Sequence, residues 1–220
     1  MVPHAKRARL TLAALVATAG LLTANASIRS PDAEVNFRTA EALAQRGSFA
    51  VEHELVSWPG FGLPVGRDGR RYSIFGPLLP LLEAPVVRIV DSLVPPDWEP
   101  ATSAVPPSHY YAHGLRAALL REPVPAKTAR GHLVRSLVSL TDVGVLVLLA
   151  LAAFELGLAL TGAVWLAWLA GALFTLGTDL LSYTTCGFSE PLALLFTLIG
   201  LRLLVDADPR IVEPPRATPR

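Results

Sequence analysis

Long uncharged runs alternate with polar, proline-containing segments along the chain. The first run, Leu10 to Ile28, has about 19 residues without a charge. As a helix it would cross roughly 30 Å of hydrocarbon. Three further apolar runs lie near residues 137–156, 160–176 and 191–205. The pattern predicts an all-α membrane protein with about four transmembrane helices.

The second run carries acids that limit its placement. Its uncharged centre, Val143 to Phe154, has about 12 residues, too few to cross a bilayer. Asp142 or Glu155 must therefore lie within the membrane or at its boundary. An ionised carboxylate at the bilayer centre costs roughly 2.5–3.5 kcal/mol, so we expect both acids near opposite interfaces. Gly157 to Gly162 predicts a tight turn between antiparallel spans two and three.

Basic residues predict the orientation. Lys6, Arg7 and Arg9 precede the first run, which favours a cytoplasmic N-terminus. We expect a cell-membrane, multi-pass protein with both termini in the cytoplasm. The predicted parts are a cytoplasmic N-terminus (1–9), the first transmembrane helix (10–28), an extracytoplasmic loop with juxtamembrane helices (29–135), transmembrane helices two to four (136–205) and a disordered cytoplasmic tail (206–220).

The first run has an alternative interpretation. Ala24-Asn25-Ala26 before Ser27 resembles a signal-peptidase site, and a basic segment precedes the run. The run is long for the apolar part of a signal peptide, so its length favours a retained anchor. Both interpretations stay open at the level of sequence.

Composition agrees with lipid as the surrounding solvent. The chain of 220 residues is 52% hydrophobic, and its mean hydropathy is +0.46. A net charge of +1 leaves no basic surface for nucleic acid, so the expected partner is the lipid bilayer. One cysteine, Cys186, excludes an internal disulfide. His109 and His113 lack a clear third ligand, so no metal site is predicted, and the sequence identifies no cofactor.

The predicted outer loop opens with a helix start. Ser30 suits the N-cap, Pro31 suits the first turn, and Gly47 suits the stop after Arg46. Acidic residues here favour the positive end of the helix dipole. The apolar face, made of Ala33, Phe37, Ala40 and Ala44, predicts a helix that lies on the bilayer surface. Further on, Phe75 to Leu82 is apolar but contains prolines, which predicts an interfacial or re-entrant segment.

A hairpin turn is predicted at Gly66 to Ser73, where Asp68-Gly69 supplies the positive φ. Arg67, Arg70 and Arg71 cluster around it. They form either a solvated tip or a contact surface for phosphate, on lipid headgroups or on a substrate.

The predicted topology brings carboxylates to one membrane face. Each of these acids either marks a helix boundary or faces a wet cavity, where one could serve as a general base. They are Asp32, Glu34, Asp142, Asp179 and Glu190.

Three segments in order resemble bacterial membrane glycosyltransferases of the GT-C superfamily, the aminoarabinose- and protein-mannosyltransferase-like enzymes. The first is Asp32-Ala33-Glu34-Val35-Asn36-Phe37 with the residues up to Phe49. The second is Gly66-Arg67-Asp68-Gly69-Arg70-Arg71-Tyr72-Ser73 followed by Phe75-Gly76-Pro77. The third is Gly177-Thr178, Tyr183 and Phe188-Ser189-Glu190-Pro191. The resemblance covers roughly residues 10 to 205 and corresponds to the N-terminal portion of such an enzyme.

The resemblance implies sugar transfer from a polyprenyl-phosphate donor to an extracytoplasmic acceptor, with inversion. It implies Asp32 as the catalytic base and Glu34 as a second acid. The residues implied for substrate binding are Arg67, Arg70, Arg71, Tyr72 and Glu190. Family enzymes are longer and have more spans, so we expect a truncated enzyme or a second chain that completes the fold. The alternative is a non-catalytic integral membrane protein or a partner subunit derived from such an enzyme.

Overall fold

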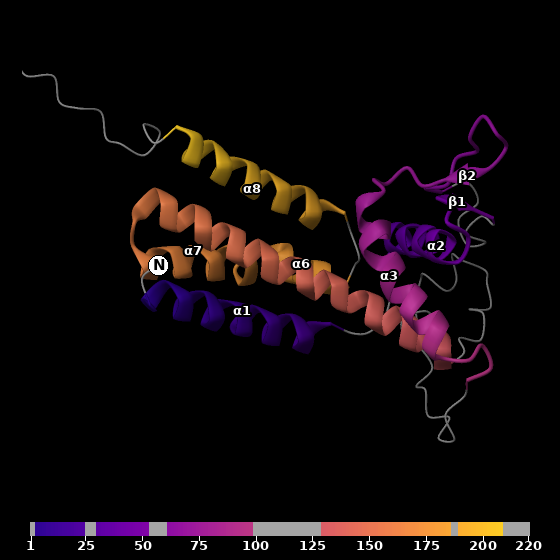
Figure 1. Ribbon diagram of the computed structural model, residues 1–220, viewed down its shortest axis with the longest axis horizontal. Helices are drawn as coiled ribbons and strands as arrows, with labels where there is room; N and C mark the ends of the chain where they lie inside the picture. Colours follow the sequence, from indigo (N-terminus) through magenta and orange to yellow (C-terminus); the bar gives the residue numbers. More distant parts are fainter. Residues whose placement is uncertain (1–2, 25–29, 53–60, 99–128, 186–188, 209–220) are drawn as a thin grey trace, which may run out of the picture. The chain divides into compact units, whose positions relative to one another are not determined.

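The computed structural model describes residues 3–24, 30–52, 61–98, 129–185 and 189–208. These residues are mostly helical, which confirms the predicted all-α class (Figure 1). They belong to two compact units. The helical unit comprises Met1–Thr23, Val143–Tyr183 and Glu190–Arg220, and the loop unit comprises Ala24–Asp142 and Thr184–Ser189.

The helical unit contains the helices expected as spans. They are α1 (Pro3–Thr23), the later part of α6 (Ala129–Thr161), α7 (Val164–Leu176) and α8 (Glu190–Ala207), with most of the 3-10 helix η1 (Asp179–Thr185). Each of the four expected spans thus overlaps a helix. Residues 25–28, the end of the first expected span, and residue 29 lie outside the described residues. So do residues 209–220, whereas Asp206 and Ala207, expected in the tail, still belong to α8.

One described helix segment, Leu133–Thr161, is long and apolar enough to cross a membrane by length and composition. Only 39% of its most apolar window is buried, whereas the core helix of a soluble protein is mostly buried. α7 is apolar but shorter, with 13 residues. α6 begins at Ala129, so the end of the segment expected as a loop is already helical.

The connection between α6 and α7 is tighter than predicted. α6 continues through Gly157 to Thr161, and the chain turns at Gly162, whose φ is +66°. Gly157 instead serves packing, because a Cβ there would lie 3.2 Å from the Cα of Ala167. The missing side chain lets the two helices approach closely, side by side in Figure 1.

The loop unit begins with α2 (Pro31–Arg46), which has the predicted bounds. The Ser30 hydroxyl accepts a hydrogen bond from the backbone N–H of Ala33 at 3.1 Å. At the other end Gly47 adopts a left-handed conformation with φ +64°, and its N–H donates to the carbonyl of Leu43 at 2.9 Å. Both caps satisfy backbone groups that a helix end leaves unpaired.

The segment Phe75 to Leu82, predicted to be interfacial or re-entrant, contains the start of α3 (Leu78–Leu93), a helix of 16 residues. Pro80 lies in its first turn, where no backbone N–H is needed, and Pro85 is accommodated inside the helix. That α3 lies at a membrane interface stays a prediction.

The apolar face of α2 packs against protein, so the prediction that it lies on a bilayer surface is wrong. Side chains of α3 and the first turns of α6 cover it and remove it from contact with lipid. The buried cluster consists of Ala33, Phe37, Ala40, Ala84, Val87, Val90, Val134 and Val138.

The predicted hairpin turn is confirmed, because Val65 and Arg71 form an antiparallel bridge on either side of it. Its second arm, β2 (Arg71–Tyr72), also pairs antiparallel with β1 (Ala50–Val51), with Ala50 opposite Tyr72. Gly69 takes a φ of +77° at the turn, and the N–H of Gly66 donates to the carbonyl of Arg70 at 2.6 Å. A small core of Val35, Val51 and Leu63 holds this hairpin against α2.

Candidate functional site

The start of α2 is joined to α6 by an ion pair within the loop unit. Arg135 donates two hydrogen bonds to the carboxylate of Glu34, at 2.6 and 2.9 Å. Arg38, one turn further along α2, donates to the same carboxylate at 3.0 Å. Arg135 is only 8% exposed, so this bidentate pair is largely shielded from water. Such a pair fixes geometry as well as charge.

Two further side chains complete what we call the Glu34 cluster: Glu34, Phe37, Arg38, Glu41 and Arg135. The guanidinium of Arg135 lies 4.4 Å from the centre of the Phe37 ring, a cation–π contact. Arg38 donates to Glu41 at 3.0 Å. Two acids and two arginines therefore balance each other.

The cluster controls the protonation of its acids. Burial alone would raise the pKa of Glu34, but the guanidinium groups of Arg135 and Arg38 outweigh it and lower this pKa to about 2. Glu41 differs, because burial dominates over Arg38 and raises its pKa. Glu34 is therefore ionised and held by cations, which makes it a poor proton acceptor. The structure gives this predicted second acid a structural role.

Asp32 lies in the first turn of α2 and is half-buried. Residues two apart on a helix point about 200° apart around its axis. Asp32 and Glu34 thus project from different sides of α2, and the Glu34 carboxylate accepts from Arg135.

The charged side chains at the hairpin tip differ in their exposure and in their hydrogen bonds. Arg67 and Arg70 are exposed, whereas Arg71 donates to the carbonyl of Leu63 at 3.3 Å. The Tyr72 hydroxyl donates to Asp68 at 2.6 Å, which lowers the pKa of Asp68 and raises that of Tyr72. Of the predicted substrate-binding residues on this hairpin, Arg67 and Arg70 are the ones that face solvent.

A buried acid that the sequence did not indicate lies on α3. Glu83 is 3% exposed, and its Oε2 atom has no hydrogen-bond partner among the described residues. Burial, with a smaller contribution from the charge of Asp142, raises its pKa well above the usual range. Glu83 was missed because it directly follows the segment predicted to be interfacial or re-entrant, so no helical face was assigned to it. The spacing of Leu79, Glu83 and Val87 on one face could have revealed it.

Glu190 is exposed and begins α8 in the helical unit, as Asp179 begins η1. Asp32, Glu34 and Asp142 belong to the loop unit, so the gathering of all five acids at one face stays a prediction. His109 and His113 lie outside the described residues, and the described residues hold no group of three potential metal ligands.

No family model, no curated protein and no solved structure matches this chain.

Proposed function

We propose that this chain is a membrane glycosyltransferase-like protein that transfers a sugar from a polyprenyl-phosphate donor to an extracytoplasmic acceptor, with Asp32 as the base. The observation that carries the proposal is that two neighbouring acids, Glu34 and Asp32, have different surroundings. Glu34 is held by Arg135 and Arg38 with a pKa of about 2. Asp32 occupies the first turn of the same helix, which the Ser30 cap holds.

The proposed sugar transfer needs few catalytic groups. The Asp32 carboxylate takes the proton of an acceptor hydroxyl while the acceptor oxygen forms a bond to the anomeric carbon. The bond between that carbon and the phosphate oxygen breaks, and polyprenyl phosphate departs with the electron pair. Arg67 and Arg70, exposed on the hairpin, would neutralise the departing phosphate. Arg71, Tyr72 and Glu190 would have supporting roles in substrate binding.

The proposal includes four spans, formed by α1, α6, α7 and α8. Two observations support it: only 39% of the most apolar window of α6 is buried, and α7 is apolar in composition. The charges before the first span favour a cytoplasmic N-terminus, which puts the loop unit, with Asp32 and the hairpin, outside the cytoplasm.

The test is release of polyprenyl phosphate from proteoliposomes that contain the full chain and a mixture of membrane-extracted acceptors. Polyprenyl-phosphoryl-mannose and polyprenyl-phosphoryl-aminoarabinose serve as separate donors. We expect Asp32→Asn to lower the release at least 100-fold, within the range attributed to a general base, in protein that still unfolds in a cooperative thermal transition. Glu34→Gln is the matched control, because it should lower the melting temperature and keep the rate per folded molecule. Full activity of Asp32→Asn would refute the catalytic role.

A non-catalytic subunit is the second candidate, and the exposed apolar stripe along α3 favours it. Leu82, Ile89 and Leu93 are 42%, 56% and 75% exposed, and a partner chain could cover them. No release from either donor, together with a stable stoichiometric complex that Ile89→Glu disrupts, would support this candidate instead.

A further inference from the structure

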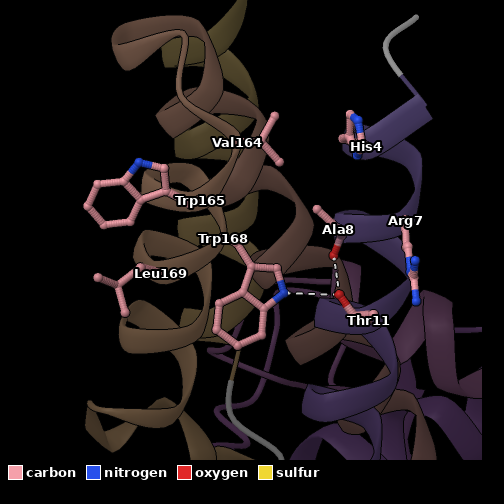
Figure 2. Close-up of a pocket in the computed structure, with 8 residues that line it drawn as sticks. All are labelled: His4, Arg7, Ala8, Thr11, Val164, Trp165, Trp168 and Leu169. Atoms are coloured by element: carbon pink, nitrogen blue, oxygen red, sulfur yellow. Dashed lines mark hydrogen bonds between the residues drawn. The ribbon is translucent and has the colours of Figure 1, made fainter.

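A pocket of about 660 Å³ lies between the start of α1 and the start of α7, within the helical unit. Figure 2 shows its lining and the hydrogen bond that crosses it, from the Trp168 indole N–H to the Thr11 hydroxyl at 3.2 Å. Thr11 in turn donates to the carbonyl of Ala8 at 3.0 Å. The lining residues are His4, Arg7, Ala8, Thr11, Val164, Trp165, Trp168 and Leu169.

The positive charge at this end of α1 is incompletely balanced. Lys6, Arg7 and Arg9 lie in the first two turns, and the first turn has no acid. Cations here oppose the positive end of the helix dipole. Arg9 is neutralised by Glu155, but no ion pair joins Lys6 or Arg7 to a described residue. An anion bound beside Arg7 would compensate both the side chain and the dipole.

The opposite wall of the pocket is apolar. Trp165 and Leu169, one turn apart on α7, are 67% and 39% exposed. A tryptophan at the edge of an apolar helix is typical of the membrane–water interface. The pocket therefore joins a cationic wall on α1 to an exposed aromatic and aliphatic wall on α7.

We propose that this pocket binds one anionic phospholipid of the cytoplasmic leaflet, with its headgroup phosphate at Arg7 and His4 and its acyl chain along Trp165 and Leu169. A soluble phosphate would satisfy the cations and leave the apolar wall uncovered. A lipid matches both walls, and a juxtamembrane basic residue is attracted to anionic lipid. This inference rests on the membrane insertion in the proposed function and is independent of sugar transfer.

The experiment is native mass spectrometry of the full chain in detergent, titrated with phosphatidylglycerol or phosphatidylcholine. Both lipids carry the phosphate, but the choline cation of phosphatidylcholine offsets its charge beside Arg7. We therefore expect about tenfold tighter binding of phosphatidylglycerol, which corresponds to about 1.4 kcal/mol. Arg7→Gln should abolish that preference. Lys6→Gln, which removes the same charge from the neighbouring residue outside the pocket, should keep it. Trp165→Ala should weaken both lipids because both would lose the acyl-chain contact.

Three results would overturn the proposal. Equal binding of the two lipids would mean that the headgroup charge is not recognised. Equal losses for Arg7→Gln and Lys6→Gln would indicate diffuse attraction and no site. Displacement of phosphatidylglycerol by equimolar glycerophosphoglycerol would show that the pocket takes a soluble phosphate. Since Asp32 is unchanged in each variant, donor turnover measured in parallel separates failure of this site from failure of the glycosyltransferase proposal.

Discussion

At the scale of single residues, Arg135 has the largest expected effect on the loop unit. Arg135→Leu would leave Glu34 shielded from water without its bidentate partner, and breaking such a pair costs about 3–5 kcal/mol. Arg38→Leu is the matched control, because Arg38 also contacts Glu34 but its side chain is 42% exposed. That change should cost about 1 kcal/mol or less. Thermal unfolding in detergent measures the stability of both variants. Equal losses of stability would contradict the assigned role of Arg135.

Glu83 gives the loop unit a dependence on pH. Its pKa is raised in the folded state, so its protonated form stabilises the fold at low pH. That contribution is lost as the pH rises from 4.5, the pKa of Glu83 in the unfolded chain, through its pKa in the folded chain. We expect Glu83→Gln, a neutral mimic, to raise the melting temperature at pH 8 and to leave it nearly unchanged at pH 4. Glu52→Gln, which removes an exposed acid, should change the melting temperature at neither pH. If Glu83→Gln stabilised the chain equally at both pH values, this titration of Glu83 would be contradicted.

The contribution of Glu34 to stability depends on pH in the opposite direction to that of Glu83. Its pKa of about 2 lies below the unfolded value, so its ion pair stabilises the fold above pH 4.5. This stabilisation is lost as pH falls toward 2, with a full amplitude on the order of 3 kcal/mol. The melting temperature of the wild-type chain should therefore fall below pH 4.5, and that fall should be smaller in Glu34→Gln. If the melting temperatures of the two proteins fell equally below pH 4.5, this role of the Glu34 ion pair would be contradicted.

At the scale of elements, Gly171 controls the packing of α7. A Cβ at this position would lie 2.7 Å from Leu12 Cδ2 and 2.8 Å from the carbonyl oxygen of Ala150. A backbone atom cannot rotate away, so Gly171→Ala should push α7 from α6 and cost about 1–3 kcal/mol. Gly144→Ala, in α6 with nothing within 4 Å, should instead gain up to about 1 kcal/mol of helix propensity. Melting temperatures that shift in the same direction would refute the close contact.

Elements with local signals were predictable. α2 was found with its bounds because Ser30 and Gly47, which cap it, act within one turn of the helix. α3 was missed because its prolines favour a break, whereas packing against α2 stabilises the helix despite Pro85. Local propensity yields to tertiary contact in such cases.

Long-range pairing explains the part of the site that the sequence did not reveal. The acid at position 34 was noted as a candidate, but its partner Arg135 is 101 residues away. Nothing in the local pattern distinguishes a catalytic carboxylate from one held by such a cation. The hairpin arginines, in contrast, follow from an Asp-Gly turn, and the exposure of Arg67 and Arg70 is what a solvated tip predicts.

At the scale of the whole molecule, the number of spans depends on helix lengths. α6 has 33 residues, about 50 Å at 1.5 Å per residue, and exceeds the roughly 30 Å of hydrocarbon. α7 has 13 residues, about 20 Å, and falls short unless η1 extends it. The contact between Arg9 and Glu155 pairs a charge on α6 with one at the start of α1. This pairing supports a position for Glu155 at the cytoplasmic interface.

Cysteine labelling of intact cells tests this topology. In a Cys186→Ser background, single cysteines replace Asp68, Thr161 or Asp206, all of which are exposed in the structure. We expect an impermeant maleimide to label Asp68→Cys from outside, and the other two only after permeabilisation. External labelling of Asp206→Cys alone among those two would mean that only one of α7 and α8 crosses, because the α6–α7 turn would still be inside. Protection of Asp68→Cys would place the loop unit in the cytoplasm, where no extracytoplasmic sugar transfer is possible.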